Sequence, residues 1–497
     1  MLAWTVYISF IGVALLMAVP KDDARLARAT ALFSALTGFI IALAGAMQHQ
    51  PAAGIATVAQ CSWIPSLGIQ YYMAVDGISV TLVLLTGFAS VVGILFSWNV
   101  EYRAKEFFAF YLALIGGVYG VFLSFDLFLL FVFYEIAIIP KYFLIAIWGS
   151  TNREYGAMKL ALYSFVGSAM VLVGLIAAYV VAGAKTFDLV ELAKFPFPES
   201  FQYWVFPLVF VGFAILAGMW PFHTWAPTGH VAAPTAASML LAGVVMKLGA
   251  YGCLRVAMTL FPLGLKAWQG PIAVLAVIGI VYGALVALTQ KDFKFVIGYS
   301  SVSHMGFVLL GLVTLNQIGL SGAVLQMFSH GILAGLLFGV VGRMVYDRTH
   351  TRDLTELRGM HLLQSMPFAA GTFAVAGMAS MGLPGFSGFP AELQVLIGAW
   401  DKLPTFAIFA GIGIVIGVAY TLRALQMAFF GDPVIGEAHS PAQEHAMSPI
   451  SVPERLGAII LIAVSVVIGL YPRLLLDLIV PSFDSPLFEA MRKGGLL

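Results

Sequence analysis

Long apolar runs separated by short polar segments recur along the whole chain. With a window of about 20 apolar residues, the length that crosses a bilayer as a helix, the pattern predicts fourteen membrane helices. Their expected ranges are 2–20, 29–47, 78–98, 107–124, 126–148, 158–182, 203–221, 234–260, 271–289, 293–313, 317–342, 367–400, 404–430 and 456–472. We therefore expect an all-α integral membrane protein.

Two of these helices are expected to be interrupted. Pro221, Pro227 and Pro234 stand between the seventh and eighth apolar runs, and Gly382 to Gly388 lies inside the twelfth. Proline removes a backbone donor and disfavours helix at the preceding residue. Broken helices of this kind mark ion sites in many transporters.

The breaks also indicate an internal repeat. Helices four to eight and nine to thirteen each form a block of five whose fourth member is broken. Because five is odd, the blocks must run in opposite directions, as inverted repeats do. The predicted divisions are 1–105 for three N-terminal helices, 106–262 and 270–430 for the two repeats, and 431–497 for a loop, the last helix and a short tail.

Composition narrows the chemistry of the chain. Hydrophobic residues make up 61% of it, charged residues only 10%, and the net charge of +1 gives no argument for nucleic acid as a partner. The two cysteines, Cys61 and Cys253, lie far apart and form no CxxC spacing. No zinc site, iron–sulfur site or disulfide is expected. Any redox chemistry is expected in partner subunits.

The basic residues predict an orientation in the lipid bilayer. One alternate set of loops carries fourteen Lys and Arg, with Lys294 among them, and the other carries eight, with Arg255 among them. The positive-inside rule then places both termini outside the cytoplasm. The first apolar run has basic residues after it and none before it, which is the reverse of a secretory signal. We expect it to be a retained helix.

Two ionisable residues lie deep inside the expected helices. Glu135 is near the middle of 126–148, and Lys247 is well inside 234–260. A lysine at the bilayer centre costs roughly 2.5 to 3.5 kcal/mol on insertion scales, so such a charge is by default functional. The structural alternative is a fixed pair that only locks helix packing.

The second half carries its own candidates. Glu392 follows the break of the twelfth helix, where unwound backbone can hold water, and is the best candidate for a terminal proton acceptor. Its alternative role is to satisfy backbone amides of the break. His304 and His330 lie on the tenth and eleventh helices, and the ordinary pKa of histidine suits a proton relay. A hydrogen-bonded core histidine is the plainer alternative.

Three further residues have two interpretations each. His223 and His230 fall in the interrupted segment and are as suited to structural hydrogen bonds as to carrying protons. Lys141 follows Pro140 nearer the cytoplasmic end of its helix, where a lysine can extend to the membrane surface. Six residues of helix leave it about 9 Å along and roughly 120° around the axis from Glu135. We expect Lys141 to point into the bundle and to reach Glu135 indirectly.

Long motifs in the chain resemble a known family, the antiporter-like M subunits of respiratory complex I, the proton-translocating NADH:quinone oxidoreductase. They are WPFHTWAPTGHVAAPTAASMLLAGVVMKLGAYG, YSSVSHMGFVLLG and DRTHTRDLTELRGM. The resemblance covers most of the chain. It implies fourteen helices, two inverted five-helix repeats, and proton pumping driven by quinone reduction elsewhere. FMN, iron–sulfur clusters and quinone are then expected in partner subunits, among them L-type and N-type relatives, in a bacterial cytoplasmic membrane. The short tail after the last helix favours M over L.

Carried over by motif, the proton-translocating residues are expected to be Glu135, Lys247, His304, His330 and Glu392. The resemblance fails at two places. The family has a lysine five residues before the proline of PFHTW, where this chain has Leu216. It also has an acidic residue between the tryptophan and the second histidine of that motif, which is absent here. Lys141 stands where an apolar residue is expected, so either it replaces the missing partner of Glu135 or the first-half channel is altered.

These departures keep three alternatives. One is a subunit of an Mrp-type cation/proton antiporter, and another is the membrane subunit of an energy-converting hydrogenase. The third is a spacer in the membrane arm that no longer pumps. Buried charges at Glu135, Lys247 and Glu392 argue against a spacer, because they are costly without a function.

Overall fold

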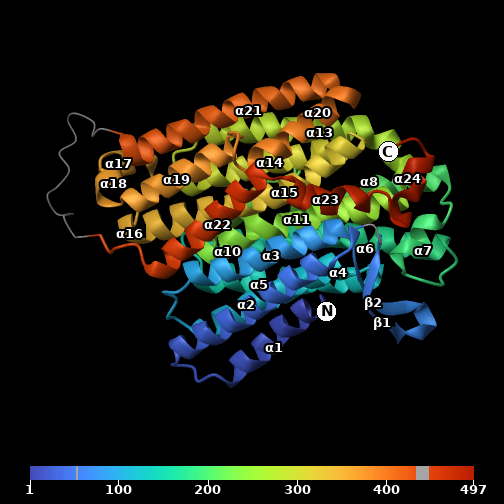
Figure 1. The fold of residues 1–497 in the computed structure, drawn as a ribbon, viewed down its shortest axis with the longest axis horizontal. Coiled ribbons are helices and arrows are strands. Elements are labelled where there is room, and N and C mark those ends of the chain that lie inside the picture. The colour runs from blue at the N-terminus through green and yellow to red at the C-terminus, as the bar shows by residue number, and fades with distance from the viewer. Residues whose placement is uncertain (52–53, 432–446) are drawn as a thin grey trace.

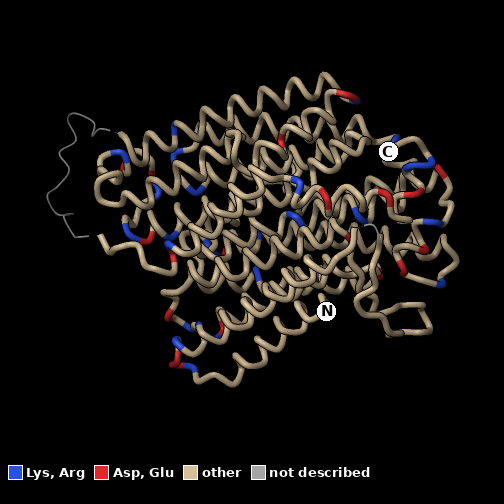
Figure 2. The backbone as a smooth tube through the Cα atoms, in the orientation of Figure 1, with Lys and Arg blue, Asp and Glu red and all other residues tan. Residues whose placement is uncertain are grey.

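The computed structural model describes residues 1–51, 54–431 and 447–497. Its helices lie side by side along the long axis of the molecule (Figure 1). Lys, Arg, Asp and Glu occur mainly toward the two ends of this bundle (Figure 2). In the described part of the chain, 12 helices are long and apolar enough to cross a membrane. The predicted fold class is confirmed.

The segments that run through the bundle follow one another in chain order. They are α1 (Trp4–Ala18), α2 (Ala24–Gln48), α3 (Gly77–Phe96), α4 (Ala104–Leu123), α5 (Leu127–Trp148), α6 (Arg153–Val181), α8 (Glu199–Ala217) with α9 (Trp225–Ala232), the run α10 (Thr235–Leu240), η3 (Leu241–Val245), α11 (Met246–Gly252), η4 (Cys253–Ala257) and α12 (Met258–Leu260), then α13 (Pro262–Thr289), α14 (Phe293–Leu312), α15 (Gln317–Phe338) with η5 (Gly339–Tyr346) and α16 (Asp347–Thr349), α19 (Pro367–Ser380) with α20 (Gly388–Lys402), α21 (Pro404–Leu425) with η6 (Gln426–Phe430), and α22 (Val452–Leu470).

Short elements cover the two ends of the bundle. One end carries α16, α17 (Leu354–Arg358) and α18 (Leu362–Ser365), and we call it the α17 end (Figure 1). The opposite end, the hairpin end, carries the strands and the remaining short helices (Figure 1). These are β1 (Ala56–Ile64), η2 (Pro65–Leu67), β2 (Ile69–Val75), α7 (Leu189–Lys194), α23 (Arg473–Ser482), η8 (Pro486–Phe488) and α24 (Glu489–Lys493).

Each of the fourteen predicted ranges contains a helix or a broken helix, but several boundaries were wrong. α13 begins at Pro262 rather than near 271, because Pro271 lies inside the helix. α22 begins at Val452, where Ser451 and Glu454 form a capping box. Two predicted divisions, at 106 and 270, therefore fall inside α4 and α13. The start of the predicted segment 431–497 lies largely outside the described residues.

The expected loop between the second and third helices contains an antiparallel hairpin. β1 and β2 pair, with Gln60 opposite Tyr72 and Ser62 opposite Gln70. Gly68, with φ of 67°, makes the left-handed turn residue after η2. A Pro and a Gly between two runs containing aromatic residues is a hairpin signal, but it is much shorter than an apolar span.

One pairing occurs twice, at opposite ends of the bundle. At the hairpin end, Asp126 caps α5 and forms an isolated antiparallel β-bridge, through its backbone, with Asp188, which caps α7. At the α17 end, Asp292 caps α14 and pairs in the same way with Asp353, which caps α17. Inverted blocks require equivalent contacts on opposite sides. The repeat boundaries themselves remain a prediction.

Two basic residues expected in loops lie buried in helices instead. Arg255, in η4, is fully buried and pairs with Asp76 at the start of α3 through Nη1–Oδ2 and Nη2–Oδ1 distances of 2.7 and 2.6 Å. Lys294 is buried in the first turn of α14. Both lie inside the predicted ranges 234–260 and 293–313, so counting them among the loop charges was wrong, and the loops carry less charge than that count gave.

Candidate functional site

The interrupted segment, which runs from the end of α8 through α9 to the start of α10, is anchored by neighbouring helices. α8 ends at Gly218, whose φ of 82° is left-handed, so the chain leaves the helix axis there. The Trp225 indole donates to the carbonyl of Ile215 at 2.8 Å, and the hydroxyls of Tyr163 and Thr224 lie 2.9 Å apart. The first bond ties α9 to α8, and the second ties the residue before α9 to α6.

Lys247 lies at the centre of the bundle, directly after the π-helical turn η3. Its Nζ donates to the carbonyl of Ala242, which is in that turn, and lies 2.7 Å from Nδ1 of His330 on α15. A π-turn shifts the backbone bonding pattern and is frequent at functional sites. A Cβ on Gly331 would come within 2.6 Å of the Gly243 carbonyl. Glycine at this crossing thus lets the two helices approach closely enough for the lysine and histidine to meet.

The second half continues this contact to Glu392. The rings of His330 and His304 have centroids 5.4 Å apart, and His304 Nδ1 lies 3.1 Å from Glu392 Oε1. Gln326 lies 3.4 Å from both the His304 ring and the Glu392 carboxylate. The structure therefore brings Lys247, His330, His304 and Glu392 together in one row of ionisable groups.

The break between α19 and α20 shapes the end of that row. Gly382 has φ of 75°, and a Cβ there would lie 2.8 Å from Glu392 Oε2. The glycine supplies both the turn and the room for the carboxylate. Glu392 is bonded to side chains of α14 and α15, so its contacts favour a relay over the alternative of satisfying broken-helix amides.

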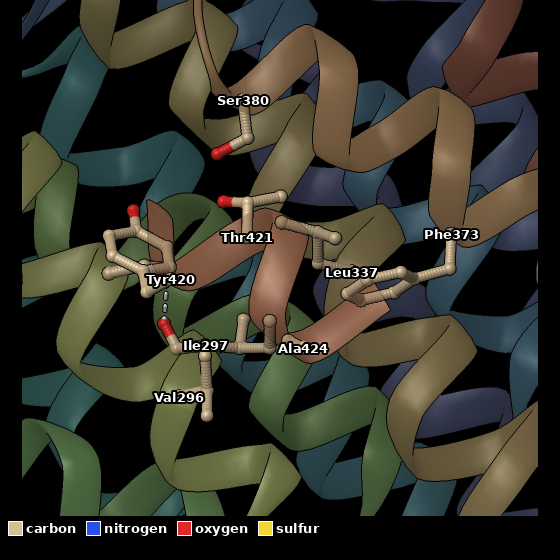
Figure 3. Close-up of a pocket in the computed structure, with 9 residues that line it drawn as sticks. Val296, Ile297, Leu337, Phe373, Ser380, Tyr420, Thr421 and Ala424 are labelled. Carbon is tan, nitrogen blue, oxygen red and sulfur yellow. Dashed lines mark hydrogen bonds between the residues drawn. The ribbon is translucent and has the colours of Figure 1, made fainter. Parts of the chain in front are cut away.

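Two small cavities adjoin this row and share Ser380, whose hydroxyl lies 3.1 Å from His304 Nε2. One contains His304, His330, Gln326 and Glu392 in its lining. The other extends between α14, α15, α19 and α21 toward the α17 end. Figure 3 shows the hydroxyls of Ser380, Tyr420 and Thr421 on one side of it and Phe373 on the other. Polar groups thus line part of the space beyond His304.

Glu135 is separate from this row. It is half-buried on α5, and among the described residues its Oε1 has no hydrogen-bond partner. Lys141 is fully buried and donates to Ser164 Oγ on α6 at 3.1 Å. Lys141 therefore points into the bundle, as expected, and does not extend to the membrane surface. Leu216 is buried against α11, where Gly249 packs onto the α8 backbone.

The two histidines of the interrupted segment are buried. His223 packs edge-on against Tyr282 and Tyr299, and His230 packs beside Phe338. No hydrogen-bond partner for either ring nitrogen of these histidines occurs within the described residues. Their two interpretations, structural hydrogen bonds and proton carrying, stay predictions.

Sequence reasoning missed Gln326, Ser380 and Ser164 as neighbours of the charged groups. Neutral polar residues are common in membrane helices, and only the packing shows which ones face an ionisable group. In the described residues no group of three or more His, Cys, Asp or Glu could hold a metal ion.

Comparison with known proteins decides the family. The family described as "NADH:quinone oxidoreductase/Mrp antiporter, TM" matches residues 124–417. Subunit M of NADH-quinone oxidoreductase from Rhodobacter capsulatus is 39% identical over 477 residues, which cover 93% of this chain and 90% of that protein. The chain belongs to the NADH:quinone oxidoreductase/Mrp antiporter family.

Within this family the chain is a homologue of subunit M, also named chain 4. Chain 4 1 of NAD(P)H-quinone oxidoreductase from Synechococcus elongatus is 37% identical over 92% of this chain and 85% of its own length. A chain of respiratory complex I from Thermus thermophilus superposes with a TM-score of 0.87 at 29% identity, covering 98% of this chain and 99% of that one. A chain of the Mrp complex from a Dietzia species superposes at 0.85 with 22% identity, over 100% and 99%, which shows a shared fold.

Proposed function

We propose that Lys247, His330, His304 and Glu392 form the central proton path of this subunit, and that Glu135 with Lys141 serves its first half. The chain is a proton-translocating membrane subunit of NADH:quinone oxidoreductase, since its relatives at 37–39% identity over about nine tenths of its length are quinone oxidoreductase subunits. The observation that carries the path is the row of contacts from Lys247 to Glu392.

These groups have the chemistry of a relay. An amine, two imidazoles and a carboxylate can each gain or lose a proton, and the short contacts let a proton pass between neighbours. Lys247 stands at the head of the row, where arrival or loss of a proton on its amine changes the charge beside His330. Quinone reduction in partner subunits would drive these changes.

The arrangement in the complex is also a proposal. FMN, iron–sulfur clusters and quinone would be held by partner subunits, with L-type and N-type antiporter-like subunits beside this chain. The α17 end would face the cytoplasm of a bacterium and both termini the other side, because basic residues concentrate in the loops of the α17 end. The repeat would run through α4–α12 and α13–α21, which the paired Asp caps support.

The alternatives fit less well. The likeness to the Mrp chain rests on 22% identity and supports the fold alone, whereas the subunit M relatives match at nearly twice that identity. A membrane-arm spacer would leave the buried row of four ionisable groups without a role.

Substitution of Lys247 tests the path. In membrane vesicles that hold the intact complex, we expect Lys247→Met to lower NADH-driven proton translocation about tenfold or more, since loss of a proton-transfer group acts at least on this scale. Lys247→Arg should be impaired as well, because a guanidinium hardly releases its proton. Full activity with arginine would show that only a fixed charge is needed.

A further inference from the structure

Lys294 is a second buried lysine, outside the row just described. It lies in the first turn of α14, near the α17 end, where a flexible lysine normally extends its amine to water. Instead its side chain is only 2% exposed, and Nζ donates to the carbonyl of Ala233 at 3.3 Å. Ala233 is the residue that ends α9, so the amine points toward the interrupted segment.

The packing around Lys294 leaves room for this inward position. A Cβ on Gly342 of η5 would come 3.3 Å from the Lys294 Cε and 2.6 Å from the Thr235 hydroxyl. The glycine thus opens a space for the lysine stem between α14, α10 and η5. The Nζ also lies 5.6 Å from the centre of the Tyr346 ring.

The charge of Lys294 is not cancelled by a direct ion pair in the described part of the chain. The neighbouring carboxylate of Asp292 contacts Arg352 Nε at 3.2 Å and caps α14, and that of Asp347 contacts Arg343 at 2.8 Å. Arg255 differs, because its guanidinium is locked on Asp76. A buried lysine without a paired carboxylate can lose its proton, unlike a locked arginine.

His230 lies on the short helix α9, three residues before Ala233. It is fully buried on α9, and neither ring nitrogen has a hydrogen-bond partner among the described residues. Its carbonyl accepts a bond from Ser238 of α10 at 2.7 Å, which fixes α9 against the helix run that carries Lys247. The same Ser238 hydroxyl lies 3.2 Å from the Ala233 carbonyl that accepts from Lys294, so Ser238 joins the end of α9 that carries His230 to the contact of Lys294.

We propose that Lys294 delivers protons from the α17 end, through His230, to Lys247. The Lys294 ammonium gives its proton to an imidazole nitrogen of His230, with water carrying it across any gap, and becomes a neutral amine. The imidazolium passes the proton to the neutral amine of Lys247, and Lys294 takes another from water at the α17 end. This proposal rests on the proposed function. In it, protons enter between the two five-helix blocks and not through Glu135.

A matched pair of lysine variants tests this input in the intact complex. Lys291 lies three residues before Lys294 at the same helix end, but it is exposed. In membrane vesicles supplied with NADH and quinone, Lys294→Met should lower protons moved per NADH, or the coupled rate, severalfold. Lys291→Met should leave both unchanged. Normal values with Lys294→Met, or an equal loss with Lys291→Met, would overturn the proposal.

The arginine variant separates proton transfer from a structural charge. Lys294→Arg keeps the positive charge and a donor for Ala233, so it should assemble even where Lys294→Met does not. We expect it to be impaired as severely as the methionine variant, whereas restored translocation would overturn the proposal. Lys247→Met, measured in parallel, separates failure of this input from failure of the central path. If it is inactive while Lys294→Met is normal, only the input fails, and if both are normal the central path fails too.

Discussion

Glu135 and Lys141 share the helix α5 but do not form an ion pair within the described residues. Lys141 is held by Ser164 of α6, and Ser168, one turn further along α6, lies beside Glu135. The two charges therefore face the same polar strip of α6. This arrangement supports an indirect link between them, and replacement of the helix-seven lysine by Lys141 stays a prediction.

A double-mutant cycle tests that link. We expect Glu135→Gln and Lys141→Met each to lower proton translocation markedly while the complex assembles, because the first keeps the shape of the side chain without its ionisation and the second removes the nearby charge. If the two act as a unit, the double variant should be no worse than the stronger single one. Coupled proton uptake and complex yield are the measurements.

Glu154→Gln is the control for that cycle, because Glu154 is an exposed carboxylate at the start of α6. Its proton translocation should match that of the unmodified protein. If the free-energy losses of the two single variants simply add in the double variant, Lys141 acts on a group other than Glu135.

The charged candidate residues could be predicted from the sequence, but the side chains that contact them could not. Glu135, Lys247 and Glu392 stand out in the sequence because a charge inside an apolar helix is expensive. The contact between Lys247 and His330 depends on the crossing at Gly243 and Gly331, which no spacing within one helix reveals. For the same reason the count of Lys294 among the loop charges was wrong, since its burial comes from elements far away in the sequence.

Broken helices are the elements on which the row depends, and Gly382 links the break to the chemistry. Alanine there would be strained at φ of 75°, and its Cβ would press on Glu392. We therefore expect Gly382→Ala to displace the carboxylate from His304 and to lower coupled proton translocation. The rate per assembled complex is the measurement.

Two other glycines separate the causes. Gly385 has φ of 100° but nothing within 4 Å of a Cβ, so Gly385→Ala carries backbone strain without the clash. Gly371, inside α19, has open space and helical geometry, so Gly371→Ala should be neutral. A loss in Gly385→Ala equal to that in Gly382→Ala would show that strain, not the position of Glu392, is responsible.

Helices could be located from the sequence wherever a run of apolar residues is long enough to cross a membrane. The fourteen ranges follow from that signal alone, but the helix ends follow from caps. Asp23 accepts a bond from the Leu26 amide and starts α2 five residues before the predicted start. Ser451 and Glu454 form the capping box that starts α22. The hairpin of β1 and β2 was missed because its strands are short and lie between long helices.

At the scale of the whole molecule, the N-terminal helices are tied to the first block by the pair of Asp76 and Arg255. The pair was invisible in the sequence, since its members are 179 residues apart. Arg255 also donates to the Tyr251 hydroxyl at 3.2 Å, and Asp76 accepts from the Ser79 amide at 2.9 Å. The charged groups of the pair are thus hydrogen-bonded within the protein, where both side chains are fully buried.

Removal of one partner should therefore destabilise the assembly without touching the proton path. A buried charge left without its partner costs about 3 to 5 kcal/mol, whereas replacing both partners by neutral groups is far less damaging. We expect Arg255→Met to lower the temperature at which the purified complex loses this subunit.

The double variant Asp76→Asn with Arg255→Met is the control. Asp76→Asn keeps an acceptor for the Ser79 amide, so the double variant should recover most of the thermal stability that Arg255→Met loses. At low temperature, proton translocation per assembled complex should stay normal in the double variant, because the pair lies outside the row from Lys247 to Glu392. A double variant as unstable as Arg255→Met would show that the arginine stabilises the fold through Tyr251 and packing rather than through Asp76.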